Sequence, residues 1–393
     1  MTKRPVFRFW SLFLLLLAAC GPTPEKFIEK AQVALAKEDF DAALLYMKNA
    51  YELSLPKEFF LTKRDLSFAF LRASHDGQRV LLVEKKAPKK VYENLKVTFI
   101  DRAQDKQKRN SIAGKIRDVN FAPNGLHAVF LQQAAANAKE CKIWLWQIEK
   151  DKVSEVGSSH CVTKPAVKDD GTVWYMRNDQ VHIYNPATEK DSLFNKGKKP
   201  EKSARKFPAY AYFHAAPDNK VWMIYGAAGS YRLYQLSDKM KLISKEIAAH
   251  RLYLVAESRI PGVFIGGAGA QQFVTLNPKD SQIGRRMPAK AWGDAAFVND
   301  KAFYYIEDGV LAYRNGSNET ELPFWAEQLA IGIKDELLFL SSTGSALRYF
   351  HKKPPLESLK SITRQSKSTT VNHDLHCFFS HRGGCRPLPA LFG

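Results

Sequence analysis

The feature that most constrains this chain is a short meander that recurs along most of its length. In residues 170–194, DGTVWYMRNDQVHIYNPATEKDSLF, three strand-like segments are separated by polar turns. Because successive side chains of a strand point to opposite faces, Val173 and Tyr175 share one face, and Trp174 and Met176 share the other. Both faces are apolar, so each small sheet needs a neighbour on either side.

About seven segments align with this meander, and their starts lie about 35 to 51 residues apart, the spacing of a four-stranded blade. Small sheets that are apolar on both faces cover one another when they stack radially. The sequence therefore predicts an all-β fold, a β-propeller of about seven four-stranded blades over residues 66–357, with six or eight blades as alternatives.

Two of the predicted blades open on a turn that resembles a known repeat. These turns read SHDG at residues 74–77 and APNG at residues 122–125. Proline fixes the first central angle of such a turn, and glycine or asparagine accepts the left-handed one. The order of strand, Ser-Pro-Asp-Gly-like turn and strand resembles the TolB-like propeller repeat, and the blade spacing is WD-repeat-like. The first turn lacks the proline, and the second lacks the aspartate.

Ahead of the blades, residues 24–56 have a helical pattern, and a linker of about eight residues follows them. Ala43, Met47 and Ala50 are spaced for one face of a helix, and Asp39 is a candidate N-cap. The segment resembles one tetratricopeptide repeat. Because a single repeat cannot bury its own faces, we expect the helical hairpin to pack on the propeller, on a partner or on itself.

Residues 1–19 are predicted to form a lipoprotein signal peptide. Three basic residues precede an apolar run at residues 10–17, which is too short to span a bilayer as a stable helix. The run ends in LAACG, which resembles the bacterial lipobox. The resemblance implies cleavage before Cys20 and lipid attachment to that cysteine, which is enough for lasting membrane attachment. The alternative is an ordinary secretory signal whose cleavage site carries a cysteine.

The residue after the predicted lipidated cysteine and the net charge bear on location and partners. Gly21 is not the aspartate that favours retention in the inner membrane, so we expect the protein in the bacterial cell envelope, at the outer membrane facing the periplasm. The chain carries a net charge of +19, and removal of the three basic signal residues leaves +16. In that compartment nucleic acid is not an expected partner.

Four cysteines remain in an oxidising compartment, where disulfides persist. Cys141 and Cys161 end two alternating strands, and a turn centred on Asp151 places them opposite each other. We therefore predict a cross-strand disulfide that closes a loop of about 20 residues and contributes about 3 kcal/mol. The alternative is two unpaired buried thiols.

Residues 358–393 have no hydrophobic period and are predicted to form a disordered or loosely ordered tail. They contain soft-metal ligands, but no standard zinc spacing fits them. We predict no metal site, and the alternatives are a disulfide between the two tail cysteines or an unstructured end. The possible metal ligands in this tail are His373, His376, Cys377, His381 and Cys385.

The sequence contains no nucleophile elbow, no H-E-x-x-H pair and no recognisable cofactor motif, so we predict no catalytic residues and no cofactor. A glycine-rich stretch at residues 266–269 precedes a strand pattern and reads as a blade turn. The favoured function is binding or scaffolding through one face of the propeller. The alternative is a propeller enzyme, a hydrolase or lyase, whose active site lies in the central channel.

A basic face is the predicted partner site. In a four-stranded meander, the loops between the second and third strands and the links between blades emerge at the same end. We expect these loops to present a positive surface that attracts an acidic envelope protein or the phosphate and carboxylate groups of the envelope. The alternative is a set of solvated loop lysines without a dedicated partner. The predicted residues are Lys85, Lys86, Lys89, Lys90, Lys196, Lys198, Lys199, Lys202, Arg205, Lys206, Arg285, Arg286 and Lys290.

Overall fold

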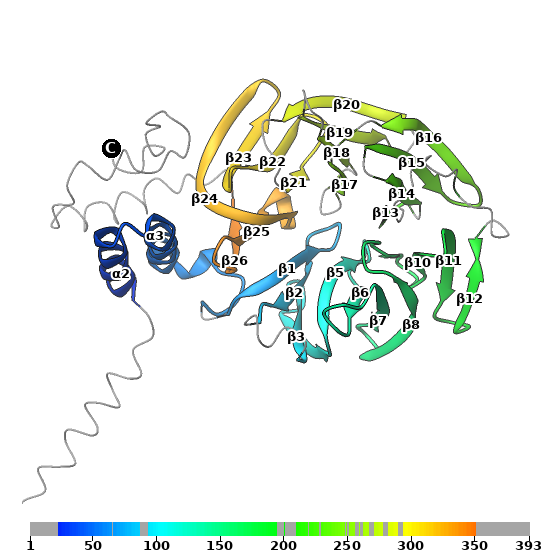
Figure 1. Cartoon of the computed structure of the whole chain (residues 1–393), viewed down its shortest axis with the longest axis horizontal. Helices are drawn as coiled ribbons and strands as arrows, with labels where there is room; N and C mark the ends of the chain where they lie inside the picture. Colours follow the sequence, from blue (N-terminus) through cyan, green and yellow to red (C-terminus); the bar gives the residue numbers. More distant parts are fainter. Residues whose placement is uncertain are drawn as a thin grey trace, which may run out of the picture.

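The computed structural model shows small sheets that follow one another around a common centre, with a helical hairpin outside the ring (Figure 1). It describes residues 23–350 except 65, 87–92, 195–199, 201–209, 219, 228, 248, 250, 256–258, 260–261, 267–270, 278–281 and 290–293. This arrangement is a β-propeller, as predicted. The predicted signal peptide, Cys20 and the predicted tail lie outside the described residues.

Five of the sheets are four-stranded and antiparallel, with their strands in sequence order or its reverse. Contacts between neighbouring sheets involve their first strands, which therefore lie innermost. The strands are β1 (Phe68–Ala73), β2 (Arg79–Glu84), β3 (Leu95–Asp101) and β4 (Lys106–Ile112); β5 (Lys115–Phe121), β6 (His127–Gln133), β7 (Glu140–Gln147) and β8 (Lys152–His160); β9 (Ala166–Val167), β10 (Val173–Arg177), β11 (Gln180–Asn185) and β12 (Lys190–Leu193); β13 (Tyr210–Ala215), β14 (Val221–Ala227), β15 (Ser230–Leu236) and β16 (Met240–Ile247); β17 (Arg251–Val255), β18 (Gly262–Gly266), β19 (Gln271–Asn277) and β20 (Gln282–Ala289).

The sixth sheet has six strands, so the expected count of about seven four-stranded blades is wrong and five are found. The cause is one long strand of 14 residues, β24, whose first part pairs with β23 and whose second part pairs with β25. The last two predicted units therefore share a strand and merge into one sheet. Its elements are β21 (Ala295–Phe297), β22 (Ala302–Glu307), β23 (Val310–Asn315), β24 (Asn318–Ile331), the 3-10 helix η4 (Ile333–Asp335), β25 (Leu337–Ser341) and β26 (Ala346–Tyr349).

The predicted helical region forms a hairpin of α2 (Pro24–Ala36) and α3 (Phe40–Ser54), followed by the 3-10 helix η1 (Lys57–Phe59). The side chain of Asp39 caps α3 by accepting a hydrogen bond from the Ala42 N–H at 3.1 Å, as its sequence position predicts. Small buried alanines on both helices allow their close approach. The relation to tetratricopeptide repeats stays a resemblance. Among the described residues, no helix is long and apolar enough to cross a membrane.

The segment after the hairpin closes the ring. Phe60 forms an antiparallel bridge with Leu347 of β26, and the Leu61 N–H donates to the Ala346 carbonyl at 3.0 Å. The chain then enters β1, where the Phe68 N–H donates to the Gly344 carbonyl at 2.8 Å. The N-terminal segment is thus hydrogen-bonded to the last sheet before the first sheet begins.

Both faces of the repeated meander are buried, as its apolar pattern predicts. Val173, Trp174, Tyr175 and Met176 are each at most 5% exposed. Val173 and Tyr175 pack in the cluster shared with the sheet β5–β8, and Trp174 and Met176 pack in the cluster shared with the sheet β13–β16. Burial of each large apolar side chain contributes about 1.5–3 kcal/mol, so these inter-sheet layers stabilise the ring.

The predicted disulfide between Cys141 and Cys161 is confirmed, with the two Cα atoms 4.9 Å apart. The strand register used to predict it is off by two residues, because Cys141 pairs with Ser159. The cause is the turn, which spans residues 148–151 and is therefore centred before Asp151, and a bulge at Ile143 recovers one position of the difference. Cys161 follows the end of β8, where its N–H donates to the Lys139 carbonyl at 2.9 Å.

Candidate functional site

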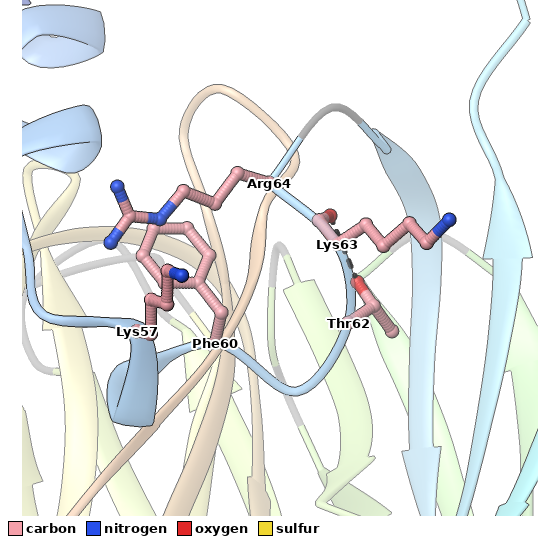
Figure 2. Close-up of a pocket in the computed structure, with 5 residues that line it drawn as sticks. All are labelled: Lys57, Phe60, Thr62, Lys63 and Arg64. Carbon is pink, nitrogen blue, oxygen red and sulfur yellow. Dashed lines mark hydrogen bonds between the residues drawn. The ribbon is translucent and has the colours of Figure 1, made fainter.

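A pocket of about 290 Å³ lies where the hairpin joins the propeller (Figure 2). Its lining comes from η1 and the segment before β1, so it forms on the same residues that close the ring. Figure 2 shows Arg64 and Lys57 beside the ring of Phe60, and Lys63 pointing away from that ring. The lining residues are Lys57, Phe60, Thr62, Lys63 and Arg64.

Arg64 is held in place by the end of α3. Its guanidinium donates to the carbonyls of Leu53 at 3.0 Å and Leu55 at 2.6 Å, which are acceptors at the helix C-terminus. The same guanidinium lies 4.7 Å from the centre of the Phe60 ring, a favourable cation–π distance. Arg64 therefore links the hairpin to the closing segment and contributes its positive charge to the pocket.

The two lysines of the pocket have a different character. Lys57 and Lys63 are exposed, and neither forms an ion pair with an acidic side chain among the described residues. Their ammonium groups are available to an anion, which Arg64 would reinforce. The pocket can therefore bind negatively charged groups.

The hairpin that borders the pocket is docked through Tyr51 and Glu52 of α3. Tyr51 packs edge-on against Trp325 of β24, with ring centres 5.6 Å apart. The Glu52 carboxylate accepts hydrogen bonds from the hydroxyls of Ser341, at 2.9 Å, and Thr343. Burial raises the pKa of Glu52, and the hydrogen bonds from Thr343 and Ser341 oppose that rise.

Two residues of the predicted basic face have described side chains, and they lie next to this junction. The Lys85 N–H donates to the Ser67 carbonyl at 2.8 Å, which places Lys85 beside a residue three positions after Arg64. The Lys86 ammonium nitrogen lies 3.5 Å from a carboxylate oxygen of Glu93, and this ion pair partly offsets the positive potential of Lys86. Neither the pocket nor its lysines were predicted. The sequence signal was the stretch KEFFLTKR, which reads as a linker.

The other members of the predicted basic face are not placed by the structure. For two arginines only the backbone, in β20, is described, and the rest fall outside the described residues. The two arginines are Arg285 and Arg286. The residues outside the described part of the chain are Lys89, Lys90, Lys196, Lys198, Lys199, Lys202, Arg205, Lys206 and Lys290.

A second charged cluster converges on the centre of the ring from the innermost strands. Arg72 of β1 lies 3.4 Å from the carboxylate of Asp118 of β5, and Lys164 lies 3.6 Å from the same carboxylate. Arg72 also donates to the Val119 carbonyl at 2.7 Å and to the Gln328 side chain at 3.2 Å. This cluster joins three sheets, and every hydrogen-bonding nitrogen of Arg72 is engaged.

Asp294 is the other carboxylate of this cluster. Burial raises its pKa, and the backbone N–H groups of Leu329 and Ala295, which donate to it at 2.9 Å, oppose the rise. The carboxylates at the centre thus hold strand ends together. This cluster could not be predicted from the sequence, because its members come from five distant segments without a common motif. Among the described residues, no group of three or more histidine, cysteine or acidic side chains is arranged to hold a metal.

No family model matches the chain, and no curated protein matches it. Among solved structures, the chain is similar to the β-propeller domain of the Trilobed protease from Pyrococcus furiosus, with 12% identity over 73% of this chain and 93% of that chain and a TM-score of 0.47. It is also similar to a streptogramin B lyase, with 12% identity, 74% and 96% coverage and a TM-score of 0.48. Virginiamycin B lyase from Staphylococcus aureus gives 11% identity, 74% and 96% coverage and a TM-score of 0.47. The propeller assignment here rests on the sheet topology.

Proposed function

We propose that this protein is a lipid-anchored binding module of the bacterial cell envelope that recognises an anionic partner at the junction of its hairpin and propeller. The partner is an acidic envelope protein or an envelope component rich in phosphate or carboxylate groups. The observation that carries the proposal is the pocket with three cationic side chains next to the predicted basic loops. We call this surface the junction face and define it by Lys57, Lys63, Arg64, Lys85 and Lys86.

The physical chemistry of the junction face favours binding by several contacts at once. An exposed ion pair contributes only about 0.2–1 kcal/mol, so a single lysine would not retain a partner. Charges that share one surface attract an anion together over about 8 to 10 Å in ordinary salt. Strand alternation puts the end of β2 and the end of β12 at the same end of the ring, and we propose on this ground that the predicted lysines that follow β12 add to this face.

The enzyme alternative has less support from the described residues. A channel enzyme needs an acidic or histidine group that can reach a substrate. At the centre of the ring, the carboxylates of Asp118 and Asp294 are instead occupied by Arg72, Lys164 and backbone N–H groups. The convergence of charge is therefore explained by the contacts that it makes between sheets.

The proposed anchor is tested separately from the partner. Lipidated protein should begin at Cys20 and carry acyl mass, and Cys20→Ala should prevent both lipidation and the cleavage that depends on it. Intact-mass measurement of protein extracted from the envelope decides the question. A mature chain without acyl groups would refute the anchor and leave the binding proposal standing.

The partner site is tested by charge reversal at three exposed lysines, Lys57→Glu, Lys63→Glu and Lys85→Glu, in one variant. The matched control reverses three exposed lysines at the opposite end of the ring, Lys106, Lys190 and Lys301, which lie in or beside turns between first and second or third and fourth strands.

We expect envelope pull-downs at low salt to lose the partner only with the junction variant, and high salt to weaken wild-type capture. Thermal unfolding of all three proteins checks that the reversals leave the fold intact. Equal losses in both variants, or no loss in either, would show that the junction face has no special role.

A further inference from the structure

We propose that the first helix of the hairpin, α2, carries a second binding site, for a phospholipid surface with anionic headgroups. Lys26, Lys30, Val33 and Lys37 follow the spacing i, i+4, i+7 and i+11, so they form one row along α2 and its C-cap. The three lysines are exposed, and Val33 between them is 55% exposed. We call these four residues the α2 row.

The α2 row is turned away from the packed face of its helix. Ala31 and Ala34 of α2 are buried against α3, at most 6% exposed. The Lys30 ammonium lies 5.3 Å from the Phe27 ring centre and 5.8 Å from that of Tyr46, so the aromatic pair supports it at the surface. No ion pair with a described acidic residue neutralises any lysine of the row.

The charges on α2 leave two lysines of the row without an acidic neighbour at helical spacing. Glu25 and Glu29 occupy a neighbouring row at i and i+4, while Lys26 and Lys30 occupy their own row at the same spacing. Like charges at i, i+4 destabilise a helix by about 0.2–0.5 kcal/mol per pair, whereas opposite charges stabilise it by as much. Lys26 and Glu29, at i and i+3, are the one close pair of opposite sign between these rows, and Lys30 and Lys37 have no acidic residue three or four positions away on α2.

The occupant follows from position and charge complementarity. Cys20, the proposed lipid attachment point, is four residues before Pro24, a reach of at most about 14 Å. The hairpin is therefore held at the membrane surface. Lysines near an anionic lipid surface contribute about 1 kcal/mol each, and a small apolar side chain between them can enter the headgroup boundary. This inference rests on the proposed anchor and not on the partner of the junction face.

The hairpin also carries most of the exposed large apolar side chains of the described residues. Within the described residues, eight large apolar side chains are more than a third exposed, and five of them belong to α2 and α3. Of these, Val33 belongs to the α2 row. The five are Ile28, Val33, Phe40, Leu45 and Met47.

The test measures binding to vesicles by a chain that starts at Gly21, which keeps every described residue and lacks the lipid. The variant carries Lys26→Glu, Lys30→Glu and Lys37→Glu, and the control carries the reversals of Lys106, Lys190 and Lys301. Vesicles contain phosphatidylethanolamine with about a quarter phosphatidylglycerol, or phosphatidylcholine alone.

We expect the α2 variant to lose at least about tenfold in partition onto the anionic vesicles, and the control to lose much less. A second variant with glutamine at the three positions should lose less than the glutamate variant, and circular dichroism checks that both stay folded. Equal losses for the α2 variant and the control would overturn the site, as would unchanged partition of the α2 variant. Because no partner protein is present, this result is independent of the junction-face experiment.

Discussion

Replacing Glu52 with alanine is expected to release the helical hairpin from the propeller. Glu52 is 5% exposed, and its carboxylate accepts hydrogen bonds from the hydroxyls of Ser341, the last residue of β25, and of Thr343 in the turn that follows. Hydrogen bonds to a charged group contribute about 1.5–3 kcal/mol each. Burial of the charge offsets part of that gain, since it raises the pKa of Glu52. We therefore expect docking to weaken by about 2–4 kcal/mol.

Replacing Glu52 with glutamine separates the hydrogen bonds from the charge. The amide oxygen can accept from the same hydroxyls, and no charge is buried, so we expect docking to change by less than about 1 kcal/mol. The pH dependence differs as well. The docked protein binds the Glu52 proton more tightly than the undocked protein, so wild-type docking is strongest at low pH and weakens as pH rises through the raised pKa. Glutamine removes this dependence.

The assay is limited proteolysis of the segment between the hairpin and β1, with hydrogen exchange of α3 as a second measurement. We expect rapid cleavage in the alanine variant and wild-type protection in the glutamine variant. Glu58→Ala is the matched control, because that side chain is exposed and lies on η1. Protection of the alanine variant at the wild-type level would refute the reasoning, as would equal cleavage of the glutamine and alanine variants.

Three further predictions concern the propeller. Reduction of the Cys141–Cys161 disulfide should lower the free energy of unfolding by about 3 kcal/mol, and guanidinium unfolding of oxidised and reduced protein measures the difference. Burial lowers the pKa of His214 from 6.5 to about 4, so the unfolded chain binds a proton in that window that the folded chain does not. Stability should therefore fall as pH drops from 6.5 to 4, and thermal unfolding of His214→Leu should lack that slope. Gly262→Ala should lower the melting temperature, because the added Cβ would overlap the ring of Phe297.

The parts of the fold that were predicted from sequence depend on local chemistry. The meander at residues 170–194 requires a tight turn between two alternating strands, and Asn178 and Asp179 supply it with φ angles of 52° and 59°. Arg177 and Gln180 then pair directly across a two-residue loop. Side-chain alternation follows from that register, so the burial of both faces could be predicted from adjacent residues alone.

The parts that were not predicted depend on distant residues or on irregular backbone. The turn between β7 and β8 is centred between residues 149 and 150 and not on Asp151, and the bulge at Ile143 then shifts the pairing back by one position, so Cys141 pairs with Ser159; nothing in the local pattern marks either change. The merging of the last two units follows from the length of β24, whose sequence alternates like two separate strands. The cluster of Arg72, Asp118 and Lys164 exists only after three sheets have come together.

The junction face couples partner binding to closure of the ring. Arg64 fastens the end of α3, and Phe60 and Leu61 pair with β26, so the pocket exists only while the hairpin is docked and the last sheet is joined. A ligand that binds only this closed state stabilises it by RT ln(1 + [L]/Kd), which is about 2.7 kcal/mol at a hundredfold excess over Kd. An anionic ligand of the pocket should therefore slow cleavage of the segment before β1 in the wild-type protein. It should restore protection to Glu52→Ala in part while this term is smaller than the docking free energy that the substitution removes, and in full once the two are equal.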